Sequence, residues 1–172
     1  MTAGGEVHRS HGLHFEDYVV GDRFEHPLGR TISEVDNTWF TLLTMNTNQL
    51  HFNADFAAQS QHGRLLVNSG FSVALVLGLS VSDMSQNAVA NLGWTNIELT
   101  HPLYVGDTLY ADSVVTEARP STSRPDVGII GCHTTGYNQD GRVILGFDRS
   151  VMIARRGTGP RRFPSSAGPT WS

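Results

Sequence analysis

The feature that most constrains this chain is a long apolar run, residues 68–85, which reads NSGFSVALVLGLSVSDMS. Its hydrophobic side chains cover almost every face of a helix, and a helix that is apolar all round is usually buried. Asn68 and Ser69 are good capping residues, and the length of the run favours a helix over the alternative, a core strand of a parallel sheet. Gly70 and Gly78 lower helix propensity but let another element pack closely. We therefore expect a central helix that the rest of the fold encloses.

From Asn87 onward the sequence has the alternating pattern of β-strands. Four strands are predicted, over Val89–Leu99, Thr108–Ala118, Val127–Tyr137 and Arg142–Ala154. In the last strand every second residue from Val143 to Ile153 shares one face, Arg149 among them. Asp140-Gly141 predicts a hairpin turn, because glycine supplies the positive φ angle that such a turn needs. Long strands joined by hairpins form an antiparallel sheet.

The first half of the chain mixes helical spacing with turns. Residues Asp36–Met45 predict a helix with Asp36 as its cap, and Ala54–Ser60 predict a second, short helix. A proline and a glycine interrupt Phe24–Thr31, which is at best a broken strand. One apolar helix and one long antiparallel sheet leave one sensible arrangement, in which the sheet curls around the helix and buries it. The predicted fold class is α+β.

Length and composition indicate one globular domain. A chain of 172 residues is long enough to bury a real core, and we expect this domain to span residues 13–156, between flexible tails at 1–12 and 157–172. The net charge of −4 argues against a nucleic-acid partner, and the arginines of the C-terminal tail are expected to be flexible rather than a binding patch. A single cysteine, Cys132, excludes an internal disulfide and a cysteine-based zinc site, and no metal site is expected.

No secretory or membrane segment is expected. The first residues, MTAGGEVHRSHG, contain no apolar stretch typical of a signal peptide. The longest apolar run, Phe71–Val81, is too short to span a bilayer. A cytoplasmic location follows by default.

Residues 46–70 carry a motif. NTNQLH at positions 46–51 is followed by a short helix, by Arg64, and by Asn68-Ser69 at the start of the apolar helix. This order resembles the MaoC-like, (R)-specific enoyl-CoA hydratases, in which Asp-x-Asn-Pro-x-His precedes a short helix, an Arg and a His-Gly pair. The segment HPLYVGDTL, residues 101–109, is similar to a strand-turn segment of the same family. The resemblance extends from about Phe15 to Ala154 and implies a hot-dog fold, a long antiparallel sheet wrapped around a central apolar helix.

The resemblance implies a hydro-lyase that reversibly hydrates an enoyl-CoA thioester and needs no cofactor. His51 matches the family's catalytic histidine and suits proton transfer, because the unperturbed pKa of imidazole lies near neutrality. The start of the buried helix offers unpaired N–H donors and a positive dipole end to the thioester oxygen as it gains charge. The expected substrate-binding residues are Asn48, Arg64, Asn68, Ser69 and Gly70.

The family's catalytic Asp is Asn46 in this chain, and an amide cannot accept a proton, although it can orient a water. Three explanations stay open. In the one that we favour, His51 acts as base and then as acid, and Asn46 places the water. In the second, another carboxylate has taken over, with Asp55, Asp36 and Asp83 as candidates. In the third, the protein is an acyl-CoA thioesterase, in which Asp55 or Asp83 activates water, or a non-catalytic acyl-CoA-binding subunit.

Residues 41–52, TLLTMNTNQLHF, suggest a subgroup. They are similar to MaoC-like enzymes that act on short, branched dicarboxylic acyl-CoAs of the mesaconyl, itaconyl or methylmalyl type. Such a substrate brings its own carboxylate, and a neutral Asn46 avoids the repulsion that an aspartate would cause. The resemblance also implies a homodimer, or a higher oligomer built from dimers, that pairs edge to edge with its sites at the interface.

Each of these candidates also has a structural alternative. His51 could cap the helix that follows it, Asn46 and Asn48 could be ordinary turn residues, and Arg64 could anchor its loop to a carboxylate.

Other residues that attract attention lack a surrounding motif. His62 and His101 are expected to be structural, and Trp39 and Trp94 to be core or interface aromatics. Cys132 lies in a predicted strand and is expected to be inert.

Overall fold

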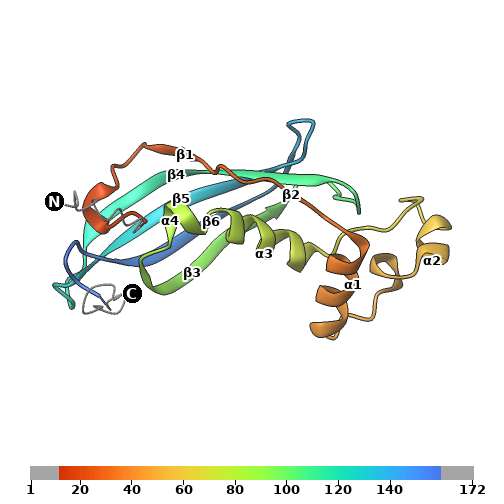
Figure 1. Ribbon diagram of the computed structural model, residues 1–172, viewed down its shortest axis with the longest axis horizontal. Coiled ribbons are helices and arrows are strands. Elements are labelled where there is room, and N and C mark those ends of the chain that lie inside the picture. Colours follow the sequence, from red (N-terminus) through yellow and green to blue (C-terminus); the bar gives the residue numbers. More distant parts are fainter. Residues whose placement is uncertain (1–11, 160–172) are drawn as a thin grey trace, which may run out of the picture.

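The computed structural model describes residues 12–159, in which six strands form one antiparallel sheet with the order β1, β4, β5, β6, β3 and with β2 paired to β4 (Figure 1). The strands are β1 (Arg23–Glu25), β2 (Arg30–Thr31), β3 (Ala88–Leu99), β4 (Thr108–Pro120), β5 (Val127–Tyr137) and β6 (Val143–Ala154). The four predicted strands are confirmed, with ends that differ by two residues at most. The broken strand is confirmed as β1 and β2, which both pair with β4. Gly141 has φ +74° in the predicted hairpin turn.

The helices are α1 (Glu34–Leu43), α2 (Ala54–Ala58), α3 (Ser69–Leu79) and α4 (Val81–Met84), with 3₁₀ turns η1 (Phe15–Asp17) and η2 (Gln49–His51). Helix α3 lies along one face of the sheet, whereas α1 and α2 project beyond one end of it (Figure 1). The cap predicted for α1 is wrong: Ser33 is the N-cap, and Asp36, at the third helical position, completes a capping box. The predicted helix over residues 68–85 is divided at Ser80 into α3 and α4.

Helix α3 and the sheet share the main core. Val76 of α3 is fully buried and belongs to the same cluster as Leu145 and Phe147 of β6. Gly136 of β5 makes this approach possible, because a Cβ atom at that position would lie 2.6 Å from Val76 Cγ2. The shared face predicted for β6 points into the core from Leu145 to Ile153, whereas Val143, at its start, is 37% exposed. This face includes Arg149, whose burial lowers the pKa of its guanidinium.

The expectation that the fold encloses α3 on every side is wrong for a single chain. Only Ser72 and Val76 of α3 are buried, and its remaining residues are half-buried or exposed. The edge strand β3 also exposes large apolar side chains: Val89, Leu92, Trp94, Ile97 and Leu99. One sheet curls over one side of a helix, so the opposite side stays uncovered.

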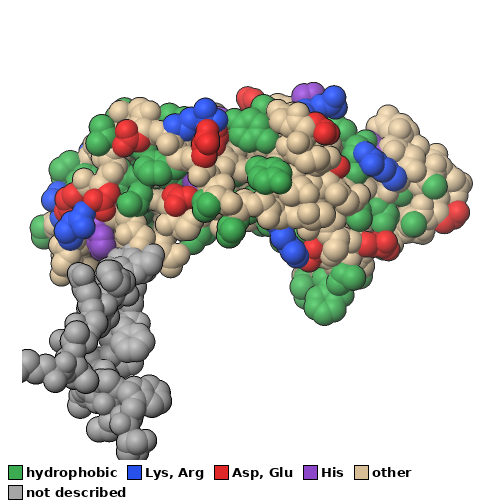
Figure 2. Space-filling view, turned by 45° about the horizontal axis from the view of Figure 1, so that its top comes forward, with side chains coloured by type: hydrophobic (Ala, Val, Ile, Leu, Met, Phe, Trp, Pro, Cys, Tyr) green, Lys and Arg blue, Asp and Glu red, His purple; other side chains and the backbone are tan. Residues whose placement is uncertain are grey.

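Helix α1 carries a second exposed apolar surface. Trp39 is 68% exposed and Leu43 81%, and Figure 2 shows hydrophobic side chains projecting at the lower edge of the molecule, where α1 lies in Figure 1. Trp39 and Trp94 are therefore not core residues, and an interface remains the other prediction for them.

Most of the two predicted tails lies outside the described residues, which leave out 1–11 and 160–172. Among residues 12–159, no helix is long and apolar enough to cross a membrane.

Candidate active site

The loop before His51 is held by its asparagines. Asn46 Oδ1 accepts a hydrogen bond from the backbone N–H of Asn48 at 2.9 Å, and Asn48 Oδ1 accepts one from the N–H of Leu50 at 3.1 Å. Both side chains therefore act as turn residues, as asparagines often do. For Asn46 this role uses only the oxygen, and no described residue accepts a hydrogen bond from its Nδ2. The Asn46 amide is still able to donate to a water or a substrate group.

His51 is 7% exposed, and its ring has a defined orientation. Its Nδ1 lies 2.9 Å from the backbone oxygen of Leu66. A carbonyl oxygen only accepts, so Nδ1 carries a proton, and in the neutral ring Nε2 keeps its lone pair. This is the tautomer that a general base needs. His51 does not cap α2; that role belongs to Asn53, whose side chain accepts from the N–H of Phe56.

The opening of α3 is capped as predicted. Asn68 is the N-cap, and its Oδ1 accepts from the N–H of Gly70 at 2.9 Å. The N–H of Gly70 is thus occupied, whereas the N–H groups of Ser69 and Phe71 have no hydrogen-bond partner among residues 12–159. A Cβ at Gly70 would lie 3.3 Å from Asn68 Oδ1, so a larger residue there would crowd the cap. Of the predicted helix-opening residues, Ser69 offers a free donor, and Phe71 is an additional one.

Two residues that the sequence did not single out hold this opening, and one of them, Asn37, also joins it to His51. Asn37 Nδ2 donates to the backbone oxygen of His51 at 2.7 Å and of Leu66 at 3.0 Å, and Asn37 Oδ1 accepts from the N–H of Asn68 at 2.8 Å. Thr41 Oγ1 accepts from Asn68 Nδ2 at 3.1 Å. Both residues are fully buried. In the sequence these two polar residues are four apart, so they lie on the same side of the predicted helix, and that spacing is the pattern that could have identified them.

A cavity of about 210 Å³ lies beside the start of α3. It is lined by His62, Leu66, Val67, Ser69, Ser72, Leu99, Thr100, His101, Pro102, Leu103 and Ile144. His51 does not line it, although the backbone of Leu66 lies between the two. His62 and His101, expected to be structural, both belong to its wall.

Arg64 is exposed and lies at the same end of the molecule. Its Cζ atom is 3.9 Å from the centre of the Tyr104 ring, an arrangement typical of a cation–π contact. Tyr104 Oη is in turn 3.3 Å from His62 Nδ1, which connects Arg64 to the cavity wall. No described carboxylate pairs with Arg64, so the guanidinium is free to bind an anion.

The three carboxylates named as alternatives to the family Asp are engaged elsewhere. Asp55 accepts from Gln59 on exposed α2. Hydrogen bonds from Ser33, followed by the charge of Arg30, hold the pKa of the Asp36 carboxyl below its usual value. Asp83 Oδ2 lies 2.7 Å from His26 Nδ1, beyond the opposite end of α3.

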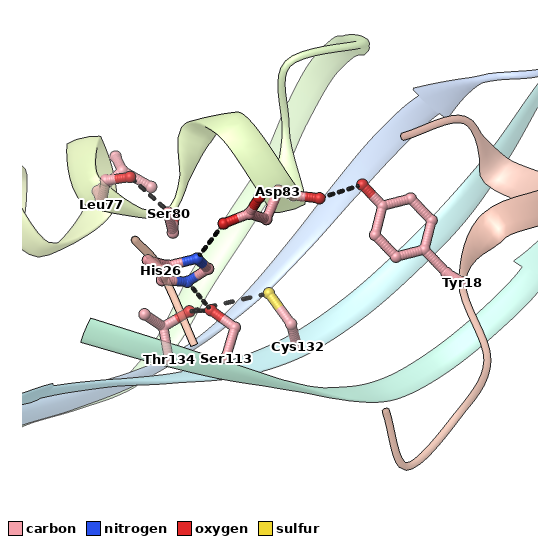
Figure 3. Close-up of polar contacts among 8 residues, drawn as sticks. All are labelled: Tyr18, His26, Leu77, Ser80, Asp83, Ser113, Cys132 and Thr134. Atoms are coloured by element: carbon pink, nitrogen blue, oxygen red, sulfur yellow. Dashed lines mark hydrogen bonds and ion pairs between the residues drawn. The ribbon is translucent and has the colours of Figure 1, made fainter. Parts of the chain in front are cut away.

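Asp83 belongs to a buried polar cluster (Figure 3). His26 Nε2 lies 2.9 Å from Ser113 Oγ, which lies 2.8 Å from Thr134 Oγ1. The order Ser113, His26, Asp83 matches the chain of contacts in a serine hydrolase. Ser113 is 0% exposed, however, so no substrate reaches its oxygen, and the cluster holds α4 to the sheet. Burial also raises the pKa of the nearby Cys132 thiol, which agrees with the expectation that it is inert.

Among the described residues, no group of three or more His, Cys, Asp or Glu side chains is arranged to hold a metal ion. The residues near the cavity are suited to an organic substrate with a polar group and an anionic end.

Residues 6–161 match the family model described as mesaconyl-CoA hydratase. A curated protein of Cereibacter sphaeroides with that name is 33% identical over 147 residues, which cover 86% of this chain and 43% of the relative. A solved structure described as a putative MaoC domain protein dehydratase from Chloroflexus aurantiacus has a TM-score of 0.82 and 31% identity, covering 95% of this chain and 46% of that one.

A Mycobacterium tuberculosis protein described as a double hotdog fold has a TM-score of 0.78 at 25% identity, covering 89% of this chain and 48% of that one. The predicted hot-dog fold and the resemblance to MaoC-like hydratases are confirmed. The chain spans about half the length of these relatives.

Proposed function

Because the chain belongs to the mesaconyl-CoA hydratase family, we propose that it adds water across the double bond of an enoyl-CoA thioester and catalyses the reverse dehydration. The observation that carries the proposal is His51, whose Nδ1–H is fixed on Leu66 so that the basic Nε2 is left for substrate chemistry.

His51 is the proposed acid and base. Its Nε2 takes a proton from water while the water oxygen bonds to the β-carbon of the thioester. The electron pair of the double bond moves to the thioester oxygen, giving an enolate, and the proton on Nε2 then passes to the α-carbon. Atoms and charge balance without a redox partner or a second carboxylate, and we propose that no cofactor is needed.

The N–H groups of Ser69 and Phe71 are the proposed donors to the enolate oxygen. They stand free at the positive end of α3, and donors fixed before the reaction lose no energy to reorganisation. One such donor typically raises the rate of the chemical step by a factor of about 10²–10³. Asn46 Nδ2 is the proposed group that places the water, in the position that the family gives to a carboxylate.

Arg64 is the proposed contact for a phosphate of CoA. It is exposed, stacks on Tyr104 and has no carboxylate partner among the described residues. The acyl group is proposed to enter the cavity beside Ser69. The names of the relatives support a short, branched dicarboxylic acyl group, and a neutral Asn46 fits a substrate with a second negative charge.

A second hot-dog unit is proposed to cover the exposed side of α3 and the edge of β3. Large apolar side chains are exposed together along this edge, as is typical of protein–protein interfaces. Relatives about twice as long as this chain support a pair of such units, and for this chain we propose a homodimer in the cytoplasm.

The test is incubation of the purified protein with enoyl-CoAs of differing length, branching and distal charge. Loss of the enoyl-thioester absorbance with free thiol unchanged is the expected result. Release of thiol instead would establish a thioesterase, and binding without either change would establish a non-catalytic subunit; each would overturn the proposal.

A further inference from the structure

We infer that Asn37 is a positioning residue: its single side-chain amide fixes both the tautomer of His51 and the distance from His51 to the opening of α3. The inference rests on the proposed function, in which His51 and the α3 donors act on one thioester. Because Asn37 is 0% exposed, a bound substrate does not reach its side chain.

The Asn37 amide has a partner for each of its N–H groups and for its oxygen. It donates to the backbone oxygens of His51 and Leu66, and it accepts from the N–H of Asn68. These partners lie 14, 29 and 31 residues away along the chain, so one group of three heavy atoms joins three segments. An amide in this position cannot be exchanged for a hydroxyl or a carboxylate without losing at least one bond.

The Leu66 oxygen is the link between Asn37 and the proton on His51. It accepts from His51 Nδ1 at 2.9 Å and from Asn37 Nδ2 at 3.0 Å. A carbonyl has two lone pairs, so both bonds form together, and the second donor fixes the direction in which the oxygen points. Loss of Asn37 would remove this second donor and leave the Leu66–Val67 peptide held by its other bond, from the N–H of Val67 to the Leu103 oxygen at 2.8 Å. The contact with the imidazole would then loosen, and the neutral ring would populate both tautomers.

The bond from Asn68 to Asn37 sets the other side of the site. Asn68 N–H is held at 2.8 Å from Asn37 Oδ1, and Asn68 is the cap residue whose neighbours, Ser69 and Phe71, carry the free N–H groups. One amide and its hydrogen bonds therefore link the backbone of His51 to the cap of α3. Such a rigid spacer matters because a misplacement of about 1 Å can cost about 100-fold in rate.

Asn37 is itself fixed, since it lies on α1 rather than in a loop. The Ser33–Asp36 capping box holds the first turn of α1, and the Phe40 ring packs on Phe71 of α3 with ring centres 5.1 Å apart. Supporting groups on helices position a site more tightly than groups on loops.

The test compares the wild type with Asn37→Asp and Asn37→Ser, and with Ser113→Ala as a control that removes a buried hydrogen bond far from the site. ¹⁵N NMR of the imidazole at a pH where His51 is neutral reports its tautomer without any substrate. Protonated Nδ1 is expected in the wild type and in Ser113→Ala, and a mixture in both Asn37 variants. A wild-type His51 protonated at Nε2 would overturn the inference outright, whether or not the variants fold.

Steady-state kinetics form the second readout. In both Asn37 variants kcat is expected to fall about 100-fold with little change in KM. The reason is that the Asn37 amide positions groups for the chemical step and does not bind the substrate. Unchanged kcat and an unchanged tautomer, at a stability matched to Ser113→Ala, would show that Asn37 is only structural. If the wild type hydrates no enoyl thioester, the proposed function fails, and the NMR comparison still decides the role of Asn37.

Discussion

His51 Nδ1 and the backbone oxygen of Leu66 lie 2.9 Å apart, and this contact places a proton on Nδ1 and leaves the lone pair of the neutral ring on Nε2. Leu66 lies just before the cap of α3, so the same contact joins the proposed proton-transfer group to the helix whose first N–H groups are the proposed donors.

His51→Gln is expected to lower hydration by about 10²–10⁴-fold, because glutamine offers hydrogen bonds but no basic nitrogen. The circular dichroism spectrum should match that of the wild type. His133→Gln is the control, since His133 pairs with Asp148 away from the site. Full activity of His51→Gln in a stopped-flow assay would refute the assignment.

Asn46→Asp separates charge from loop structure. A carboxylate oxygen can still accept from the N–H of Asn48, so the turn is expected to persist. A negative charge should disfavour dicarboxylic substrates, since unit charges about 4 Å apart repel by about 1 kcal/mol even in water. The ratio of kcat/KM for dicarboxylic over monocarboxylic enoyl-CoAs is expected to fall about fivefold. An unaltered substrate profile would contradict the repulsion argument.

Ser113→Ala is expected to reduce stability without changing turnover. It leaves the buried His26 Nε2 without the partner that lies 2.9 Å away, at a cost of about 1–3 kcal/mol in the free energy of unfolding. Urea denaturation measures this loss, and the hydration assay should give the wild-type kcat. Loss of thioester turnover in the folded variant would instead mean that the Ser113, His26, Asp83 chain is catalytic.

Asp36→Asn tests the capping box of α1 through the pH dependence of the protein's stability. Hydrogen bonds from Ser33, then the charge of Arg30, hold the pKa of Asp36 below its usual 3.8 in the folded protein. A carboxyl whose pKa is lowered on folding contributes stability above its unfolded pKa and loses that contribution as the pH falls through the folded pKa.

The Tm of Asp36→Asn should therefore lie about 2–4 °C below that of the wild type at pH 7, the decrease expected when a helix cap is lost. This difference in Tm should narrow as the pH falls below about 4. Asp140→Asn, in the exposed hairpin turn, is the control and should leave Tm unchanged. A gap that stays constant down to pH 3 would rule out the carboxylate as its source.

Leu92→Asp tests the proposed dimer. Leu92 is 48% exposed on β3, and an aspartate there would place a charge in the proposed interface. Sedimentation analysis should show a dimer for the wild type and a monomer for the variant. Val19→Asp, at a residue 61% exposed and outside β3, is expected to remain dimeric. A wild type that sediments as a monomer at all concentrations would refute the homodimer.

Local pattern in the sequence was enough for most of the fold. Alternating residues predicted the long strands, and Asp140-Gly141 predicted their hairpin, because side-chain period and turn chemistry depend on near neighbours. The cap of α1 was misplaced because an aspartate serves equally at the cap and at the third helical position, and only the backbone geometry at Ser33 distinguishes the two.

The sequence by itself determined an apolar helix, an antiparallel sheet to cover it, and a histidine in a recognisable motif. Only the tertiary structure decided how the ring of that histidine is held. Asn37, Leu66 and Asn68 are far from His51 in the chain, and hydrogen bonds between distant segments leave no periodic pattern to read. The exposed side of α3 could not be predicted either. Apolar residues all round a helix indicate that the helix is covered, but they do not indicate whether one chain or two cover it.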